Sequence, residues 1–333
     1  MRLTWPAPGT DARGSFPRAS PPPDMSSVLA SLVPVFLVIM AGWLARVTGF
    51  VEDKHWPGLE KVTYVVFFPA IIIATLAKAE LADVPVGGVG AALVAAILVN
   101  AGGLMALRGT MERRLGVAGP SFTSIFQGAT RWNTFVALAV AGSLFGERGL
   151  ALMAVAIAVM IPLLNLLAIG VLVRFAGGPP QSARQIVSAI VTNPFIWSSA
   201  IGVFLNATGL PLPRPILGFV EILGAAALGA GLIVVGAGLD MRRLARPGAA
   251  HWIAIATKMI LLPIVAVSLA RTLGVVGDDL VVVAIASSVP TASGGYILAK
   301  QMGGDAALMA EIITIQTLAA MLTMPVMITL LTL

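Results

Sequence analysis

Long apolar runs, separated by short polar connections, fill the chain from residue 28 to its end. A helix needs roughly 20 apolar residues to cross the ~30 Å of hydrocarbon in a bilayer. Ten runs reach that length, and the connections hold turn formers and charges. The predicted spans are 28–46, 60–78, 86–107, 120–145, 149–174, 185–207, 214–238, 249–271, 279–301 and 306–332. This pattern predicts an all-α membrane protein with ten transmembrane helices.

Spans one to five can be superposed in order on spans six to ten, with their starts offset by 154 to 163 residues. Pro162 in span five then corresponds to Pro325 in span ten, and the polar centre of span four at 131–134 corresponds to Pro290 and Thr291. Each half has an odd number of spans, so the second half enters the membrane from the opposite side. We therefore predict two inverted five-helix repeats, with chance divisibility of any ten-helix chain as the alternative.

The predicted domain organisation follows from these halves. The first repeat covers 25–174, a short cytoplasmic loop covers 175–184, and the second repeat covers 185–333. Residues 1–24 are rich in proline and lack apolar periodicity, which predicts a disordered tail without the apolar centre of a signal peptide. Met25 leads directly into the first span, and our hypothesis is that it is the natural start.

Composition excludes several classes of protein. A chain of 333 residues that is 58% hydrophobic and 11% charged is too apolar for a soluble globular protein. The net charge of +6 comes from residues in short loops, which indicates membrane orientation and argues against nucleic-acid binding. There is no cysteine and there are two histidines, so we predict no metal site and no cofactor. The absence of GxSxG, HExxH and Walker motifs argues against an enzyme.

The distribution of basic residues predicts the orientation. Loops one, three, five, seven and nine, with the span ends that border them, hold 12 Lys and Arg residues. The opposite face holds 4, and the tail adds 3. Because Lys and Arg concentrate on the cytoplasmic side, both termini are predicted to lie outside the cytoplasm.

The stretch 284–303, AIASSVPTASGGYILAKQMG, has a proline in the middle of a membrane-length apolar run. Pro290 supplies no backbone donor and its ring obstructs the preceding turn, so the helix should break there. Within lipid, such a break is tolerated only where protein or trapped water satisfies the freed carbonyls. Broken helices at this depth are typical of substrate sites in secondary transporters.

Arg131 stands in an unusually polar part of span four, FQGATRWNTF at 126–135. A charge at mid-bilayer costs about 2.5–3.5 kcal/mol or more, so a deep arginine is a functional candidate. Its planar donor fork suits a carboxylate, and Gln127, Asn133 and Thr134 could complete the recognition. The alternative is a structural role, in which Arg131 binds the carbonyls freed by the broken helix opposite.

Other polar residues in the spans have less specific signals. Lys258 is predicted to have a structural or coupling role, either at carbonyl ends of the crossing or paired with Glu311. Gln316 lies deeper in span ten and is predicted to line the site. Asn165 and Asn193 are typical of polar groups in helix packing.

The deep charges favour an anionic substrate. No acidic residue lies near the centre of a predicted span, whereas Arg131 and Lys258 both do. An anion would be attracted by Arg131 and by the amide-rich start of the half-helix that follows Pro290. The same asymmetry argues against a proton pump built on paired carboxylates.

Four motifs resemble the auxin efflux carrier family, especially its bacterial malonate-carrier-like branch. They are PTASGGYILAKQMGGD at 290–305, RWNTFVALAVAGSLFGERG at 131–149, VVFFPAIII in span two and TNPFIWSSAIGVFLNATGLPLP in span six. The resemblance extends from Met25 to the C-terminus.

This resemblance implies two inverted repeats with a scaffold of helices one, two, six and seven and a transport unit of the other six. Helices four and nine would cross as broken helices at the substrate site, and transport would use elevator-type alternating access. The motif match places Asn133, Thr134, Pro290, Thr291 and Ser293 at the crossing.

The chain departs from the family pattern in two places. Ala139 stands where many members have a proline, which leaves open whether helix four is broken or only kinked. The long central loop of the plant auxin carriers is missing, which argues against auxin as the substrate. We therefore expect a secondary transporter of small organic anions, malonate or a similar carboxylate, in the bacterial cytoplasmic (inner) membrane.

Two alternatives remain at this level: a sodium-coupled organic anion symporter of the bile-acid type, and a membrane sensor of carboxylates that transports nothing. The expected partners are the anion and the lipid bilayer. The sequence leaves open the direction of transport, the coupling ion (proton or sodium) and association into a homodimer.

Overall fold

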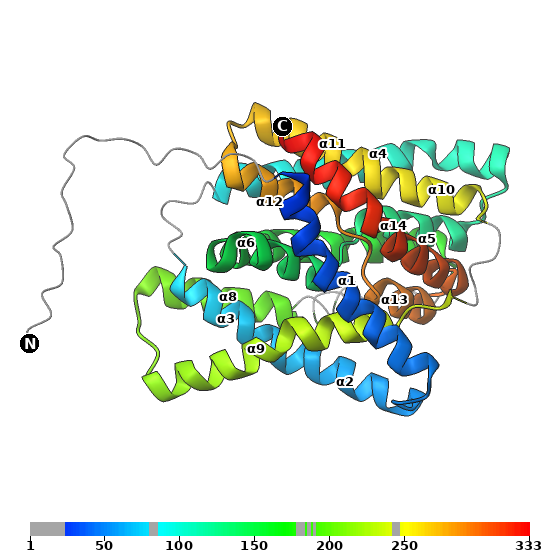
Figure 1. Cartoon of the computed structure of the whole chain (residues 1–333). Helices are drawn as coiled ribbons and strands as arrows, with labels where there is room; N and C mark the ends of the chain where they lie inside the picture. Colours follow the sequence, from blue (N-terminus) through cyan, green and yellow to red (C-terminus); the bar gives the residue numbers. More distant parts are fainter. Residues whose placement is uncertain (1–23, 80–85, 178–183, 185–187, 189–190, 242–246) are drawn as a thin grey trace, which may run out of the picture.

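The computed structural model describes residues 24–79, 86–177, 184, 188, 191–241 and 247–333 (Figure 1). Every regular element in these residues is a helix, as expected for an α-helical membrane protein. The predicted disordered tail lies outside the described residues except for Asp24, whose carboxylate accepts a bond from the Ser27 backbone N–H at 3.0 Å and caps the first helix. Part of the predicted loop 175–184 also lies outside them.

The helices run through the whole described chain. The first part contains α1 (Met25–Val47), η1 (Asp53–His55), α2 (Trp56–Val62), η2 (Thr63–Phe67), α3 (Phe68–Lys78), α4 (Val86–Leu115), α5 (Gly119–Thr130) and α6 (Thr134–Phe175). The second part contains α8 (Pro194–Thr208), α9 (Arg214–Ala237), α10 (Ala249–Ala256), η5 (Thr257–Leu261), α11 (Leu262–Thr272), α12 (Gly277–Ser288), α13 (Gly294–Met302) and α14 (Ala306–Thr332).

Seven helical stretches in the described residues are long and apolar enough to cross a membrane, by length and composition. One of them, 119–175, includes both α5 and α6, and Gly146 with φ 56° turns the chain inside α6 between predicted spans four and five. Predicted spans four and nine are interrupted helices, and part of span six is not described. The ten-span layout therefore stays a prediction.

Two of the membrane-length helical stretches contain a π-turn just before a proline. In η2 the Phe68 N–H bonds to the Thr63 carbonyl ahead of Pro69, and in η5 the Leu262 N–H bonds to the Thr257 carbonyl ahead of Pro263. Proline lacks the donor that an unbroken α-helix needs, and single-turn π segments are one way to absorb the defect.

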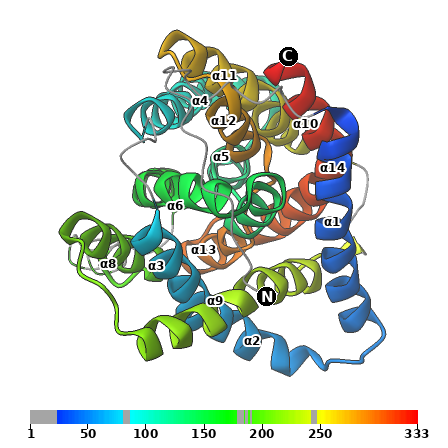
Figure 2. The ribbon, with the colours of Figure 1, turned by 60° about the vertical axis from the view of Figure 1, so that its left-hand side comes forward.

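The helices pack in two groups with the longest one between them. Helices α3, α8 and α9 pack together on the lower side of Figure 1, and α1 crosses α9 in close contact. Helices α4, α11 and α12 pack on the upper side, with α5 and α6 in the middle of the molecule, and Figure 2 shows the same division from another direction.

Glycines bring α1 and α9 unusually close. A Cβ added to Gly236 would lie 1.7 Å from the Ile39 carbonyl oxygen, and one added to Gly42 would lie 2.1 Å from the Ile233 carbonyl oxygen. Small residues permit this approach, which gains van der Waals contact between membrane helices.

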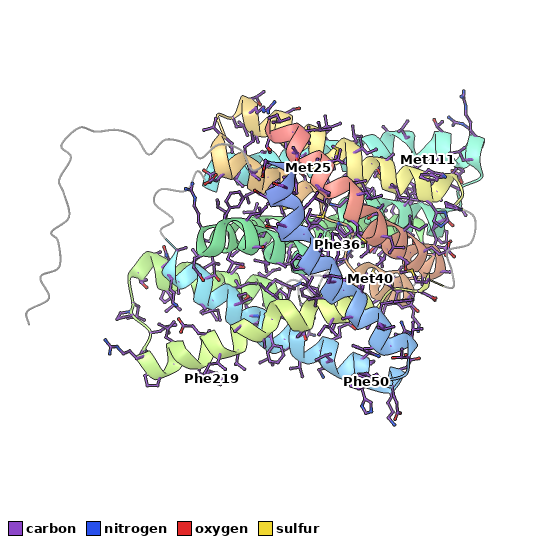
Figure 3. The ribbon with its side chains drawn as sticks, in the orientation of Figure 1. Met25, Phe36, Met40, Phe50, Met111 and Phe219 are labelled. Carbon is purple, nitrogen blue, oxygen red and sulfur yellow. The ribbon has the colours of Figure 1, made fainter. Side chains whose placement is uncertain are left out.

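The outward faces of the bundle are apolar. Phe219 on α9 is 62% exposed and points away from the other helices in Figure 3, and Phe50, just after α1, is 87% exposed. Large apolar side chains on the outside are expected where the solvent is lipid. The start of α1 lies beside the end of α14, where the Thr329 hydroxyl is 3.7 Å from the Met25 sulfur. Both ends of the described chain therefore lie on the same side of the bundle.

Candidate functional site

The two interrupted spans meet at their breaks. Helix α5 ends at Thr130 and α6 begins at Thr134, while α12 ends at Ser288 and α13 begins at Gly294. The connecting segments touch, because the backbone N–H of Asn133 donates to the carbonyl of Pro290 at 2.8 Å. Four half-helix ends thus converge on one place inside the bundle.

The break after Thr130 settles what Ala139 leaves open in the sequence. Arg131 has an extended backbone (φ −64°, ψ 156°), and Asn133 restarts the helix by accepting bonds from the N–H groups of Phe135 and Val136 at 3.1 and 3.2 Å. Ala139 lies six residues further on, inside α6. Span four is therefore broken, and an asparagine cap rather than a proline ends the break.

Side chains join the two breaks to neighbouring helices. The side-chain carbonyl of Gln316 accepts from the Thr291 N–H at 3.0 Å, and its side-chain NH₂ donates to the backbone carbonyls of Gly128 and Ala254 at 2.9 and 3.0 Å. The Thr291 hydroxyl donates to the Gln127 carbonyl at 3.3 Å. Because the breaks free backbone groups in a buried place, these bonds satisfy groups that water cannot reach.

A cavity of about 540 Å³ lies beside the crossing. The two breaks and their flanking turns contribute one wall, and α2, η2, α6 and the start of α8 contribute the others. Its polar and charged lining residues are Glu60, Lys61, Tyr64, Arg131, Asn133, Thr134, Asn165, Asn193, Ser293 and Gln301. Trp132, Phe135, Ile161, Leu164, Phe195, Ile297 and Leu298 contribute apolar surface.

Arg131 provides the positive charge at the crossing. One guanidinium nitrogen donates to the Asn165 side-chain carbonyl at 3.1 Å, while Nε is buried without a hydrogen-bond partner in the structure. The start of α13 lies next to it, since a Cβ added to Gly294 would lie 3.8 Å from a guanidinium nitrogen. No side chain caps that helix start, although Ser293 is at the cap position. The N–H groups of Gly295 and Tyr296 donate to the carbonyls of Ala292 and Ser293, whereas no partner is described for the N–H of Gly294. A helix start beside a guanidinium is an arrangement that favours anions.

Four of the eight predicted substrate-binding residues line the cavity, namely Arg131, Asn133, Thr134 and Ser293. The other four are buried behind it and are not among its lining residues: Gln127, Pro290, Thr291 and Gln316. The half-helix start that faces the cavity is therefore at Ser293 and Gly294, two to three residues beyond the expected Thr291. The side-chain oxygen of Asn133 accepts the bonds that cap α6, which leaves its side-chain NH₂ as the group that can donate.

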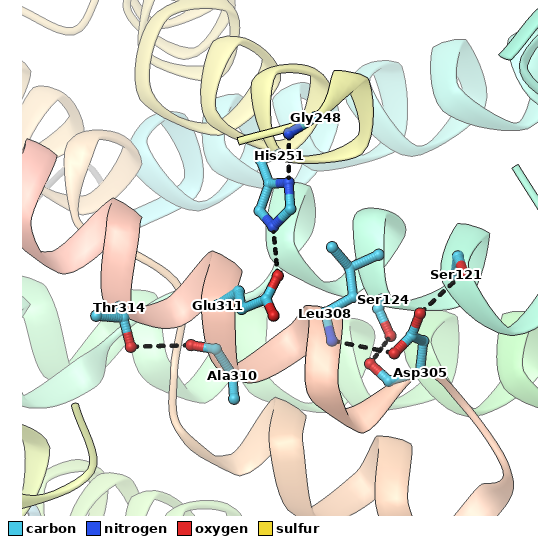
Figure 4. Close-up of polar contacts among 9 residues, drawn as sticks. All are labelled: Ser121, Ser124, Gly248, His251, Asp305, Leu308, Ala310, Glu311 and Thr314. Carbon is cyan, nitrogen blue, oxygen red and sulfur yellow. Dashed lines mark hydrogen bonds and ion pairs between the residues drawn. The ribbon is translucent and has the colours of Figure 1, made fainter. Parts of the chain in front are cut away.

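Lys258 and Glu311 do not contact each other. The Lys258 ammonium donates to the Ser287 carbonyl at 3.4 Å, at the end of α12. The Glu311 carboxylate instead lies 2.8 Å from Nε2 of His251, which joins α14 to α10 (Figure 4). Of the two arrangements expected for Lys258, the structure has the one at a carbonyl end.

Figure 4 also shows how the start of α14 is attached to α5. The Asp305 carboxylate accepts from the Leu308 N–H at 3.0 Å and from the Ser121 hydroxyl at 2.9 Å, and the Ser124 hydroxyl donates to the Asp305 carbonyl. These bonds fix the starts of α5 and α14 against each other.

Sequence reasoning missed part of the site. Asn165 and Asn193 resemble packing groups in the sequence, yet both line the cavity, and neither Tyr64 nor Phe195 is predicted as a site residue. Asn193 also caps α8 by accepting from the Phe195 N–H at 2.9 Å. The one usable signal is the π-turn that Pro69 predicts near Tyr64, because such turns are frequent at functional sites.

Together, the apolar helical bundle and the interrupted helices beside a charged cavity define an α-helical membrane transport protein. Comparison with known proteins agrees. Residues 179–328 match the family model described as "Membrane transport protein". The chain is also 24% identical over 305 residues to an "Uncharacterized transporter" of Methanothermobacter thermautotrophicus, which covers 89% of this chain and 95% of the relative.

Both matches are to membrane transport proteins, which agrees with a transporter and with the family resemblance of the sequence motifs. They name no substrate and no branch of transporters.

Proposed function

We propose that the protein is a secondary active transporter of small organic anions, such as malonate or a similar carboxylate. The observation that supports this proposal best is the pairing of Arg131 with the uncapped start of α13 in the wall of a 540 Å³ cavity. A carboxylate between them would accept bonds from the guanidinium and from the backbone N–H of Gly294, and would face the positive end of the helix dipole.

The remaining charges of the cavity support an anion as well. Among its lining residues, Glu60 is the one acid, and it lies beside Lys61 near the end of α2 rather than at the crossing. Arg131 therefore has no carboxylate partner within the described residues. A half-buried guanidinium without a counter-charge gains from an anionic ligand, because partly desolvated charges are stabilised by pairing.

Helix packing supports the inverted-repeat layout that we propose for the fold. Predicted span one (α1) packs on span seven (α9), and span six (α8) packs on span two (α3), as the exchange of two equivalent repeats requires. Span three (α4) packs on span eight (α11), its own equivalent. This arrangement is common among secondary transporters, which place the substrate where the repeats meet.

The position of the cavity supports movement of one helix group against the other. Its walls come from both sides: Phe195 belongs to α8 and Tyr64 to η2, which packs on α3 and α9, whereas Arg131 and Ser293 belong to the two connections at the crossing. A substrate held between two groups changes sides when one slides past the other, which is the elevator mechanism that we propose.

The predicted orientation indicates the side of the membrane to which the cavity opens. It extends from the crossing to Pro57 and Glu60, which follow the first loop, a cytoplasmic loop by its basic residues. We therefore propose an inward-facing conformation in a bacterial cytoplasmic membrane, with both termini on the non-cytoplasmic side.

Uptake of radiolabelled carboxylates into proteoliposomes tests the proposal. Replacing Arg131→Ala removes a charge-assisted bond, so the KM for the anion should rise by roughly 10- to 100-fold or uptake should vanish. Arg131→Lys should retain part of the uptake, and Arg271→Ala, on the exposed end of α11, should behave as wild type.

The substrate panel should include malonate, monocarboxylates and sterol anions, each with and without sodium. Normal uptake by Arg131→Ala would contradict the proposed site. Saturable binding without any flux would identify a sensor instead. Sodium-dependent uptake that prefers sterol anions would identify a symporter of the bile-acid type.

A further inference from the structure

Lys258 is a fully buried cation with little around it to balance its charge. Its exposed fraction is 0%, and within the described residues its ammonium group has one hydrogen bond, the 3.4 Å contact with the Ser287 carbonyl, and no ion pair. It is not among the residues that line the cavity. A buried charge is costly unless something requires it, so its role calls for an explanation.

The first half of the chain has a neutral group in the corresponding place. Asn100 on α4 donates its amide to the carbonyl of Ala129, near the end of α5, at 2.8 Å. Lys258 and Ser287 each lie 158 residues after Asn100 and Ala129. The two side chains are thus equivalent donors to equivalent half-helix ends, and one of them is charged.

The two half-helix ends differ in how their carbonyls are satisfied. In the last turn of α5, the carbonyls of Gln127, Gly128 and Ala129 accept from three neutral side chains, Thr291, Gln316 and Asn100. In the last turn of α12, residues 285–288, Lys258 is the one described side chain that donates. Ser288, the last residue of α12, also has a buried hydroxyl without a partner.

A carbonyl end that lacks neutral donors attracts a cation. The C-terminus of a helix carries a partial negative charge, and transporters with broken helices use such ends, with unwound carbonyls, to bind coupling cations. Here the ammonium group of Lys258 already stands at that end, and the π-turn of η5 contains it.

We infer that Lys258 is a tethered counter-cation, which supplies from within the chain the positive charge that the end of α12 would otherwise take from solution. The transporter therefore needs no sodium ion at this position. Shortening the side chain should uncover a subsite for a small monovalent cation, bounded by the last carbonyls of α12 and the Ser288 hydroxyl. The claim that transport needs no sodium ion here rests on the proposed function. The claim that shortening Lys258 uncovers a cation subsite does not.

The first test uses the melting temperature of the purified full-length protein in detergent. Lys258→Ala removes Cγ, Cδ, Cε and Nζ, which together have the size of a propylammonium ion. Propylammonium, and sodium more weakly, should raise the melting temperature of Lys258→Ala saturably, because a ligand that binds the folded state stabilises it. Wild type and the control Lys300→Met, which changes an exposed lysine on α13, should show no such response.

The second test uses uptake in liposomes. Wild-type uptake should be the same when sodium is replaced by N-methylglucamine. Lys258→Met, which keeps the length but loses the charge, should lower uptake by roughly 30-fold, as a charge at a helix C-terminus can be worth. Propylammonium should restore part of the uptake of Lys258→Ala, a response that loss of packing alone would not give.

Three results would overturn the inference: sodium-dependent uptake by wild type, normal uptake by Lys258→Met, or no response of Lys258→Ala to any cation. If Lys258→Ala does not fold, uptake by Lys258→Met and by Lys258→Arg decides, because arginine keeps the charge and should keep sodium-independent transport. If wild type moves no anion at all, the proposed function fails, and the melting-temperature test still decides the cation subsite.

Discussion

Gln316 and Gln127 offer a matched test of what holds the two broken helices together. Both side chains are completely buried, with 0% of their surface exposed, and both lie at the crossing. The side chain of Gln316 makes three hydrogen bonds to backbone groups, whereas neither Nε2 nor Oε1 of Gln127 has a hydrogen-bond partner in the structure. Replacing each by methionine keeps the length of the side chain and removes its polar atoms.

The expected cost of Gln316→Met follows from the bonds that are lost. Hydrogen bonds between membrane helices contribute about 0.6 kcal/mol on average and up to ~1.7 kcal/mol, so three of them amount to roughly 2 kcal/mol. The Thr291 N–H and the Gly128 carbonyl have no other partner in the described residues, and leaving buried groups unpaired adds to the cost. We therefore expect a loss of about 2–4 kcal/mol. Gln127→Met should be neutral or stabilising, since it removes buried polar atoms that have no partner.

Thermal unfolding of the detergent-purified variants, followed by tryptophan fluorescence, measures the difference. At ~2 °C per kcal/mol for a chain of this size, Gln316→Met should melt about 4–8 °C below wild type, and Gln127→Met should melt at or above it. Equal melting temperatures for Gln316→Met and wild type would refute the cross-link. Normal stability of Gln127→Met combined with lost uptake would return Gln127 to the substrate path, where the sequence places it.

Two further predictions concern helix contacts. Gly236→Ala places a methyl group against the Ile39 carbonyl and should lower the free energy of unfolding by about 1–3 kcal/mol. The control Gly229→Ala, on the same helix, meets nothing within 4 Å and should not destabilise the protein. Denaturation in detergent compares the two variants, and equal stability would contradict the close packing of α1 on α9. His251 accepts from the Gly248 N–H through Nδ1, so Nε2 carries the proton that bonds Glu311. His251→Ala should therefore lower the melting temperature more than Glu311→Gln, which keeps an acceptor, and the opposite order would refute this assignment.

Several features of the molecule follow from the sequence because their cause is local. Pro290 has no backbone N–H to donate, so it predicts a helix break whichever helices pack around it. The apolar runs predict helices, and their length predicts a membrane environment. Arg131 is recognisable as a site residue because a deep charge is expensive in any arrangement of the helices.

Other features depend on which helices become neighbours. The break at Arg131 contains no proline or glycine, and it exists because Asn133 caps α6 while its N–H bonds to Pro290 on another span. Whether Lys258 pairs with Glu311 or with a carbonyl could not be predicted, since His251, 60 residues away from Glu311, takes the carboxylate.

The cavity shows the division most clearly. The sequence by itself determined that Arg131 stands in a membrane-length apolar run and that a second such run is interrupted at Pro290, because proline, charge and hydropathy act through the chain's own backbone and through the cost of desolvation. Only the tertiary structure decided that Tyr64, Asn165 and Asn193 share the wall with Arg131, and that Thr291 and Gln316 lie behind it. Which residues line the cavity depends on the packing of helices far apart in sequence, and no residue's own chemistry specifies which neighbours it will meet.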